Sequence, residues 1–263
     1  MVWHENNPPL EKGGWGDLKL HFRVKYVIVL FMPTQLIFPL DFADLRHALK
    51  YVNMLKNYVH VFKIGLELFV SAGPEAIKGV LEAGGSRIFL DMKFHDIPET
   101  VRRALKTPYI QDVEFITVHS SDGPDMLKAA VNSVPDKTRI LAVTVLTSQG
   151  ETDMKKILLL RDDVGLTDLV IHRAKMAKAS GCAGIVCSGQ EISVIREHLG
   201  KDFIVVTPGV RPAWSLIPGD DQKRIVTPRD AAKLGSDYIV VGRPIRDAKD
   251  PVEATVKIIE EIS

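Results

Sequence analysis

The sequence predicts a single α/β domain, a (β/α)8 barrel (TIM barrel), on three observations. From Leu36 onward, eight short apolar runs rich in β-branched residues alternate with amphipathic segments. The apolar runs are continuous, as expected of parallel strands that are covered on both faces. No linker or shift in composition divides this part of the chain, and single α/β barrels commonly reach about 250 residues.

The apolar runs are expected to form the eight strands. They are Leu36–Leu40, His60–Ile64, Arg87–Leu90, Phe115–Val118, Ile140–Leu146, Gly184–Cys187, Phe203–Val206 and Tyr238–Val241. An open doubly wound sheet is the alternative, but it would normally have fewer strands and a glycine-rich first turn. The turn after the first run, residues 41–44, contains no glycine, so we favour the barrel.

Several of the segments between the runs have a helical period. Residues 44–58 place five apolar side chains on one face at spacings of three and four: Leu45, Ala48, Leu49, Val52 and Leu55. Residues 74–83 repeat this pattern and are followed by two glycines, which are a stop signal. Residues 168–180 and 251–262 are expected to be helices for the same reason.

Residues 1–31 lie outside the alternating pattern. Residues 1–19 are rich in Pro, Gly, Asn and Trp and have no period. The basic residues before the apolar run 26–32 resemble a signal peptide, but Pro33 interrupts the run and no small-residue cleavage site follows. The run is also far shorter than a membrane span. We expect 1–31 to be a disordered or non-essential extension, with Met32 as a possible true start, and 32–263 to be the barrel domain.

Composition excludes several classes of protein. The chain is 46% hydrophobic and 25% charged, which is typical of a globular protein. A net charge of +1 argues against a general nucleic-acid binder. Cys182 and Cys187 cannot form a disulfide framework and no CxxC or Cys/His cluster suggests zinc. We expect a cytoplasmic protein with no nucleic-acid or membrane partner.

Polar residues collect where the predicted strands end. In chain order they are Asp41, Lys63, Asp91 with Lys93, His119, Thr147, Ser188, Arg211 and Arg243. Any one of them alone would more often be a solvated loop residue. Their recurrence over successive strands favours a functional site, because barrel enzymes carry their sites at the carboxyl ends of the strands.

The densest polar stretch follows the third strand. Residues two apart in a strand share a face, so Asp91 and Lys93 are expected to point to the same side. Asp96 lies past the strand, just before Pro98, which can open a helix. This spacing fits a preorganised array of charges and a salt bridge with a helix cap equally well.

Two later stretches indicate a phosphate site. Residues 207–212 follow the seventh strand and residues 242–244 the eighth, and each contains a glycine and an arginine. Glycine lets backbone amides approach an anion, and arginine can hold phosphate oxygens with a bidentate fork. Turn chemistry would explain either stretch alone. Both together favour phosphate, which barrels often bind with these two loops.

Four motifs closely resemble the orotidine 5'-phosphate decarboxylase family. They are Asp91-x-Lys93-x-x-Asp96-Ile-Pro-x-Thr100, Pro208-Gly-Val-Arg-Pro212, Gly219-Asp-Asp-Gln222-Lys-Arg-Ile-Val-Thr-Pro228 and Val241-Gly-Arg243-Pro-Ile245. The resemblance covers about residues 36–263. It implies a homodimeric barrel that converts orotidine 5'-phosphate to UMP and CO2, the last step of de novo pyrimidine synthesis, without a metal or organic cofactor.

The resemblance also implies a role for each matching residue. Lys63, Asp91, Lys93 and Asp96 would form a charge network with Lys93 as the proton donor, and Asp96, Ile97 and Thr100 would reach into the partner subunit's site. Asp41 and Lys63 would bind ribose hydroxyls, and Thr147 the pyrimidine. Gln222, Arg211, Gly242 and Arg243 would surround the phosphate. Pro39 departs from the small residue expected there, and a proline removes a donor from the strand ladder.

Two alternatives remain beside this interpretation. One is a related barrel enzyme such as 3-keto-L-gulonate 6-phosphate decarboxylase or hexulose-phosphate synthase, which share the Asp-x-Lys-x-x-Asp pattern. Those enzymes resemble metal-dependent enzymes and have a glutamate after the second strand. This chain has Lys63 there, which would repel Mg²⁺. The other alternative is a catalytically inactive nucleotide-binding protein. The presence of every polar residue that the chemistry needs argues against it.

Overall fold

The computed structural model describes residues 34–159, 161–215 and 224–263. Eight parallel strands close into a barrel in which each strand pairs with its neighbours in chain order, which confirms the predicted fold class. The strands are β1 (Gln35–Pro39), β2 (Val61–Gly65), β3 (Ile88–Phe94), β4 (Phe115–His119), β5 (Arg139–Val143), β6 (Gly184–Val186), β7 (Ile204–Thr207) and β8 (Tyr238–Val240). The extension at 1–31 lies outside the described residues.

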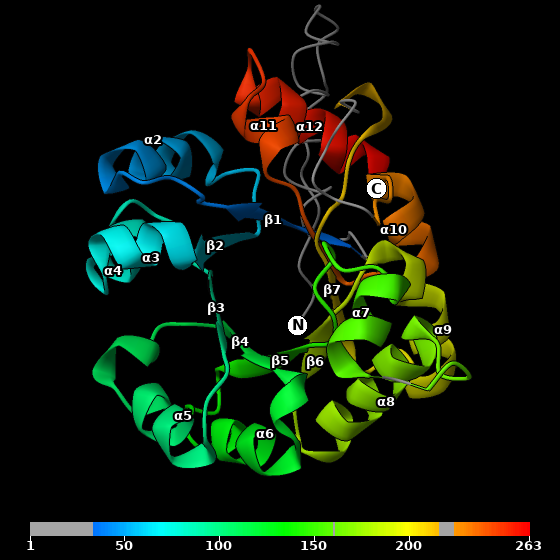
Figure 1. The fold of residues 1–263 in the computed structure, drawn as a ribbon. Coiled ribbons are helices and arrows are strands. Elements are labelled where there is room, and N and C mark those ends of the chain that lie inside the picture. The colour runs from blue at the N-terminus through cyan, green and yellow to red at the C-terminus, as the bar shows by residue number, and fades with distance from the viewer. Residues whose placement is uncertain (1–33, 160, 216–223) are drawn as a thin grey trace, which may run out of the picture. The chain divides into compact units, whose positions relative to one another are not determined.

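Helices surround the strands (Figure 1). Their bounds are α2 (Leu45–Leu55), α3 (Leu66–Ala72), α4 (Glu75–Glu82), α5 (Pro98–Leu105), α6 (Pro124–Val131), α7 (Glu151–Leu158), α8 (Leu166–Ala179), α9 (Ile192–Leu199), α10 (Pro228–Leu234), α11 (Arg243–Arg246) and α12 (Pro251–Glu261). Four short 3₁₀ turns are η1 (Pro108–Ile110), η2 (Ser120–Asp122), η3 (Gly189–Glu191) and η4 (Ala213–Ser215). The four predicted helices correspond to α2, α4, α8 and α12. No described helix has the length and apolarity that crossing a membrane requires.

Side chains fill the barrel below its carboxyl end. Eight buried residues from seven strands form this plug: Ile37, Val61, Phe89, Phe115, Leu141, Val206, Tyr238 and Val240. The rings of Phe89 and Tyr238 both meet Phe115 edge to face, with centroids 6.0 Å and 5.1 Å away. These side chains fill the interior of the barrel, and the cavity that the strand-end residues line opens toward the carboxyl ends of the strands.

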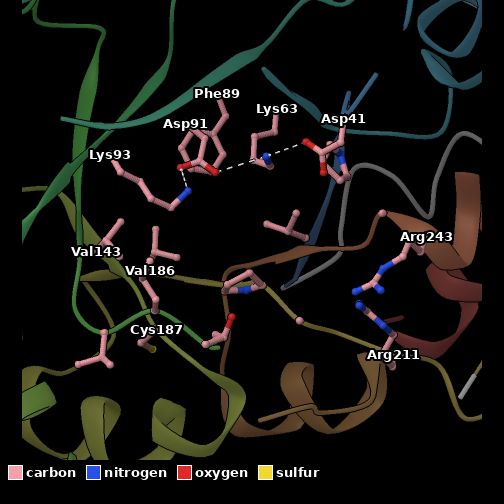
Figure 2. Close-up of a pocket in the computed structure, with 18 of the residues that line it drawn as sticks. Asp41, Lys63, Phe89, Asp91, Lys93, Val143, Val186, Cys187, Arg211 and Arg243 are labelled. Atoms are coloured by element: carbon pink, nitrogen blue, oxygen red, sulfur yellow. Dashed lines mark hydrogen bonds and ion pairs between the residues drawn. The ribbon is translucent and has the colours of Figure 1, made fainter. Parts of the chain in front are cut away.

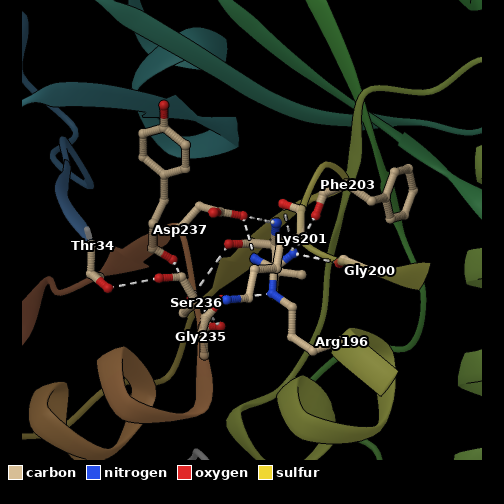
Figure 3. A network of polar contacts seen from close by, with 11 residues as sticks. Thr34, Arg196, Gly200, Lys201, Phe203, Gly235, Ser236 and Asp237 are labelled. Atoms are coloured by element: carbon tan, nitrogen blue, oxygen red, sulfur yellow. Dashed lines mark hydrogen bonds and ion pairs between the residues drawn. The ribbon is translucent and has the colours of Figure 1, made fainter. Parts of the chain in front are cut away.

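A polar network ties the amino ends of β7 and β8 to α9 (Figure 3). The Arg196 guanidinium donates to the carbonyls of Gly235 (2.8 Å) and Phe203 (2.7 Å) and pairs with Asp237 at 2.5 Å. Asp237 in turn accepts the Val205 amide at 2.7 Å. These contacts satisfy turn carbonyls that would otherwise lie half-buried without partners.

Strand β3 departs from the regular alternation that the sequence predicts. Its register against β4 shifts between Leu90 and Phe94, and Lys93 has a φ of +50°, in the left-handed region. Asp91 and Lys93 still line one cavity, as expected, but a bulge rather than a straight pleat brings them together.

At β1, Pro39 pairs in register with Lys63, and the next amide, that of Leu40, donates to the Lys63 carbonyl. The proline therefore does not interrupt the pairing.

Candidate active site

One cavity of about 500 Å³ opens at the carboxyl ends of the strands, within the size range of small-molecule sites. Eight of the residues predicted from the sequence line it: Asp41, Lys63, Asp91, Lys93, Thr147, Arg211, Gly242 and Arg243. They come from the ends of β1, β2 and β3 and from the segments after β5, β7 and β8. The barrel thus brings together residues that are up to 202 positions apart in the chain.

Four side chains form a row of alternating charge along one wall (Figure 2). Lys63 Nζ lies 3.3 Å from Asp41 Oδ1 and 3.3 Å from Asp91 Oδ2. The other Asp91 oxygen, Oδ1, accepts from Lys93 Nζ at 2.9 Å. Lys63 and Asp91 have only 12% of their side chains exposed, whereas Lys93 has 34% and Asp41 46%. The inner pair is therefore fixed, and the outer two groups remain accessible to a ligand.

The row keeps its inner members ionised. Burial alone would lower the pKa of the Lys63 ammonium, but the carboxylates of Asp91 and Asp41 outweigh burial and raise that pKa above its usual value. Burial alone would raise the pKa of the Asp91 carboxyl, but Lys63 and Lys93 lower it. Both inner groups are charged at neutral pH because each one stabilises the other.

Two arginines lie across the cavity from this row. The guanidinium groups of Arg211 and Arg243 point toward one another (Figure 2). Gly242 lies beside them, and a Cβ at this position would stand 2.9 Å from Cγ of Pro39. Two cationic forks that face one another in a cavity have the chemistry to hold an anion with several oxygens, such as phosphate.

Comparisons with known proteins agree with this geometry. Residues 34–258 match the model of the "Orotidine 5'-phosphate decarboxylase / HUMPS family". The orotidine 5'-phosphate decarboxylase of Desulfosudis oleivorans is 45% identical over 236 residues, covering 86% of this chain and 92% of that protein. The one from Trichlorobacter lovleyi is 41% identical over 235 residues, covering 87% and 95%. This chain belongs to the orotidine 5'-phosphate decarboxylase family.

Solved structures of the family agree with the fold. The crystal structure of orotidine 5'-phosphate decarboxylase from Lactobacillus acidophilus superposes with a TM-score of 0.74 at 35% identity, covering 89% of this chain and all of that one. The enzyme from Pyrococcus horikoshii superposes with a TM-score of 0.70 at 25% identity, covering 86% and 98%. The barrel is therefore the architecture of the family.

Three of the residues that match the family motifs do not line the cavity of their own chain. Asp96, Ile97 and Thr100 are exposed around the start of α5, and Ile97 has 66% of its surface accessible. The Asp96 carboxylate accepts from the Ile97 amide at 2.7 Å. A fourth, Gln222, lies outside the described residues.

Sequence reasoning missed two residues that shape the charged row. Thr117 of β4 is fully buried, and its hydroxyl accepts from the Lys93 amide and donates to Asp91 Oδ1, both at 2.9 Å. At Gly65, a Cβ would stand 3.0 Å from Lys63 Nζ and 3.2 Å from Asp41 Oδ1. A polar residue inside an apolar strand is a signal for Thr117. Nothing local in the sequence distinguishes Gly65 from an ordinary strand-end glycine.

Cys187 also lines the cavity, on the side of β6. Burial raises the pKa of its thiol, so the thiol stays neutral and is a poor nucleophile. In the described part of the chain, no three His, Cys, Asp or Glu residues are grouped as ligands of a metal ion would be.

Proposed function

We propose that this chain catalyses the decarboxylation of orotidine 5'-phosphate to UMP and CO2, the last step of de novo UMP synthesis. The observation that carries the proposal is the row Asp41–Lys63–Asp91–Lys93 facing Arg211 and Arg243 across one cavity. The substrate has the matching order of groups. A pyrimidine carboxylate stands at one end, ribose hydroxyls in the middle and a phosphate at the other end.

Net charge supports the same substrate. Among the described lining residues, four cationic side chains face two carboxylates: Lys63, Lys93, Arg211 and Arg243 against Asp41 and Asp91. A fifth lining cation, Arg246, is paired with Asp247 at 2.7 Å. A phosphate carries about −1.5 to −2 charges at neutral pH, and the pyrimidine carboxylate adds another. The excess of positive charge in the cavity therefore suits a ligand with these two anionic groups.

The proposed chemistry needs one proton and no redox partner. The bond from C6 to the carboxylate breaks, CO2 leaves, and the electron pair stays on C6 until Lys93 Nζ supplies a proton. An ammonium ~4 Å from the developing charge contributes about 4 kcal/mol at an effective dielectric of 20. Enzymes typically supply ~8–23 kcal/mol, so contacts to phosphate and ribose that tighten in the transition state contribute the rest.

Lys63 favours this function over the metal-dependent relatives. Its ammonium lies between the Asp41 and Asp91 carboxylates, 3.3 Å from each. A divalent cation bound by carboxylates would need this position. The ammonium supplies the positive charge there and leaves no need for the metal.

The finer parts of the proposal concern assembly and location. We propose a homodimer in which Asp96, Ile97 and Thr100 complete the partner's site, which is supported by their exposure at the edge of the barrel mouth. We propose a cytoplasmic enzyme, since Cys182 and Cys187 are both buried free thiols. Residues 1–31 are proposed to be dispensable, so that a chain starting at Met32 keeps its activity.

An absorbance assay of the purified protein tests the function. Orotidine 5'-phosphate is supplied with and without a chelator, and we expect equal rates of loss of the substrate absorbance. A parallel reaction contains 3-keto-L-gulonate 6-phosphate and Mg²⁺. Turnover of that sugar phosphate without turnover of orotidine 5'-phosphate would contradict the proposal and would favour the activity of the metal-dependent relatives.

A further inference from the structure

Two buried arginines hold the backbone of residues 144–147, the segment after β5 that would face the pyrimidine of the proposed substrate. Arg173 of α8 donates from Nη1 to the Thr144 carbonyl at 2.6 Å. Arg224, which comes 78 residues after Leu146, donates from Nη2 to the Leu146 carbonyl at 3.0 Å. Leu146 and Thr147 both line the cavity. The segment is therefore held at two of its carbonyls by side chains that do not themselves line the cavity.

Arg224 is itself held in place by a buried acid. Its Nη1 pairs with Oε1 of Glu191 in η3, and both side chains are almost fully buried, at 6% and 5% exposed. The second Glu191 oxygen, Oε2, accepts the Ser188 amide at 2.7 Å. The guanidinium thus joins the segment after β6 to the segment after β5.

The residues that follow Arg224 are attached to the phosphate side. The Val226 carbonyl accepts the Arg211 amide at 2.9 Å, and Val226 forms a parallel bridge with Val210. Val226 also packs on Gly189, where a Cβ would stand only 2.4 Å from its Cγ1. Val226, which is bonded to the Arg211 backbone, is therefore only two residues after Arg224, whose side chain holds the Leu146 carbonyl.

We propose that Arg224 is a positioning residue that keeps the pyrimidine-facing segment, residues 144–147, at a fixed distance from the phosphate-facing segment that carries Arg211. The inference rests on the proposed function, because orotidine 5'-phosphate would touch both segments at once. Binding energy from a phosphate can act on a reaction at the pyrimidine only if the two subsites are rigidly connected.

Stability is a weak explanation for this pair. Buried ion pairs often contribute less than well-packed apolar side chains would, because both charges lose their hydration. Arg224 Nε is buried and has no hydrogen-bond partner among the described residues, which adds to the cost. Unlike an apolar side chain, the Arg224 guanidinium contacts Glu191 and the Leu146 carbonyl at the same time.

The test compares two substrates in two matched variants. Arg224→Met removes the link between the subsites. Arg173→Met removes the hydrogen bond to the Thr144 carbonyl of the same segment and leaves the Glu191–Arg224 pair in place. We measure kcat/KM for orotidine 5'-phosphate and, by chromatography of the uridine formed, for the phosphate-free nucleoside orotidine. For Arg224→Met we expect a loss on the order of 10- to 100-fold with the phosphorylated substrate and little change with orotidine. For Arg173→Met we expect similar losses with both.

Arg224→Lys guards against a folding defect in Arg224→Met. Lysine keeps a charge beside Glu191, but its single nitrogen cannot span Glu191 and the Leu146 carbonyl, so we expect the same selective loss with an unchanged melting temperature. Equal losses with both substrates in Arg224→Lys would overturn the inference and leave the proposed function intact. A wild-type protein that converts neither substrate would instead contradict the proposed function.

Discussion

Lys93 is placed by its backbone as much as by its charge. Its φ of +50° lies in a region that non-glycine residues rarely occupy, and such a conformation costs on the order of 1–3 kcal/mol. The Thr117 hydroxyl holds the Lys93 amide at 2.9 Å, and Asp91 holds the ammonium at 2.9 Å. The side chain is thus anchored at both ends before any substrate binds.

Lys93→Ala should abolish decarboxylation and leave the fold intact, because it removes the proposed proton donor and no core side chain. General acid–base catalysis alone typically contributes ~10²–10⁴-fold. The measurement is turnover in the absorbance assay, with the melting temperature as the control for folding. Retention of more than about a tenth of wild-type turnover would show that another group donates the proton.

Arg243→Ala should weaken binding of the phosphorylated substrate. Loss of a hydrogen bond to a charged group costs about 1.5–3 kcal/mol, which raises KM by roughly one to two orders of magnitude. Orotidine, which has no phosphate, should be converted almost as well as by the wild type. An equal loss with both substrates would remove the phosphate assignment of Arg243.

At the scale of elements, the histidine at the end of β4, His119, should make the free energy of unfolding depend on pH. Burial, together with the nearby charges of Arg173, His95 and Lys93, lowers the pKa of His119 to about 4. Ser121 donates its amide to His119 Nδ1 at 3.3 Å, as suits a neutral ring. An unfolded chain has a histidine pKa of about 6.5, so between these two values the unfolded state binds more protons than the folded state.

The free energy of unfolding should therefore fall as the pH is lowered from about 6.5 toward 4. His119→Asn removes the titrating ring, so the variant should lose less stability than the wild type between pH 7 and pH 5. Urea unfolding at both pH values measures the difference. If both proteins lose the same amount, His119 is protonated in the folded state and its ring is not held neutral.

The polar contacts at the amino ends of β7 and β8 should contribute to the stability of the fold and not to catalysis. Arg196→Met should lower the free energy of unfolding by at least about 1.5–3 kcal/mol, the usual cost of losing a hydrogen bond to a charged group. Its contacts with Asp237 and with four backbone carbonyls, those of Gly200, Lys201, Phe203 and Gly235, are lost together. This network precedes β7 and β8, at their amino ends, and none of its residues lines the cavity at the carboxyl ends. KM and kcat at 25 °C should therefore be unchanged. A large change in kcat would contradict this separation.

At the scale of the whole molecule, the proposed dimer predicts complementation between inactive variants. Asp96→Ala and Lys93→Ala, each inactive alone, should recover activity when their subunits exchange. In a mixed dimer with two-fold symmetry, one site receives intact Lys93 from one chain and intact Asp96 from the other. Random exchange puts about half of the subunits into such dimers, so recovery should approach a quarter of wild-type activity.

Each variant mixed with itself is the control and should stay inactive. Exchange itself is verified with differently tagged chains. A mixture that exchanges and yet remains inactive would show that Asp96 serves the site of its own chain, and the shared-site proposal would then be wrong.

The sequence alone determined the barrel and most of the charged residues that line the cavity. Burial on both faces of a parallel strand leaves continuous apolar runs, so the eight strands are visible without a structure. The first polar residue after such a run must lie at the carboxyl end of the barrel, which places Asp41, Thr147 and Arg243 at one mouth. These inferences need only local patterns and the parallel direction of the strands.

Tertiary structure decided how the charges meet and which distant groups hold them. Lys93 lies in the bulge of β3, where its amide donates to Thr117 and its ammonium to Asp91. Arg224 supports Leu146 from 78 residues away. Neither contact leaves a periodic trace in the sequence, because each depends on where a separate strand or loop lies once the barrel has closed. Hydrophobic periodicity records which residues are buried, whereas the distance between two polar groups is set only by the packing of all the elements between them.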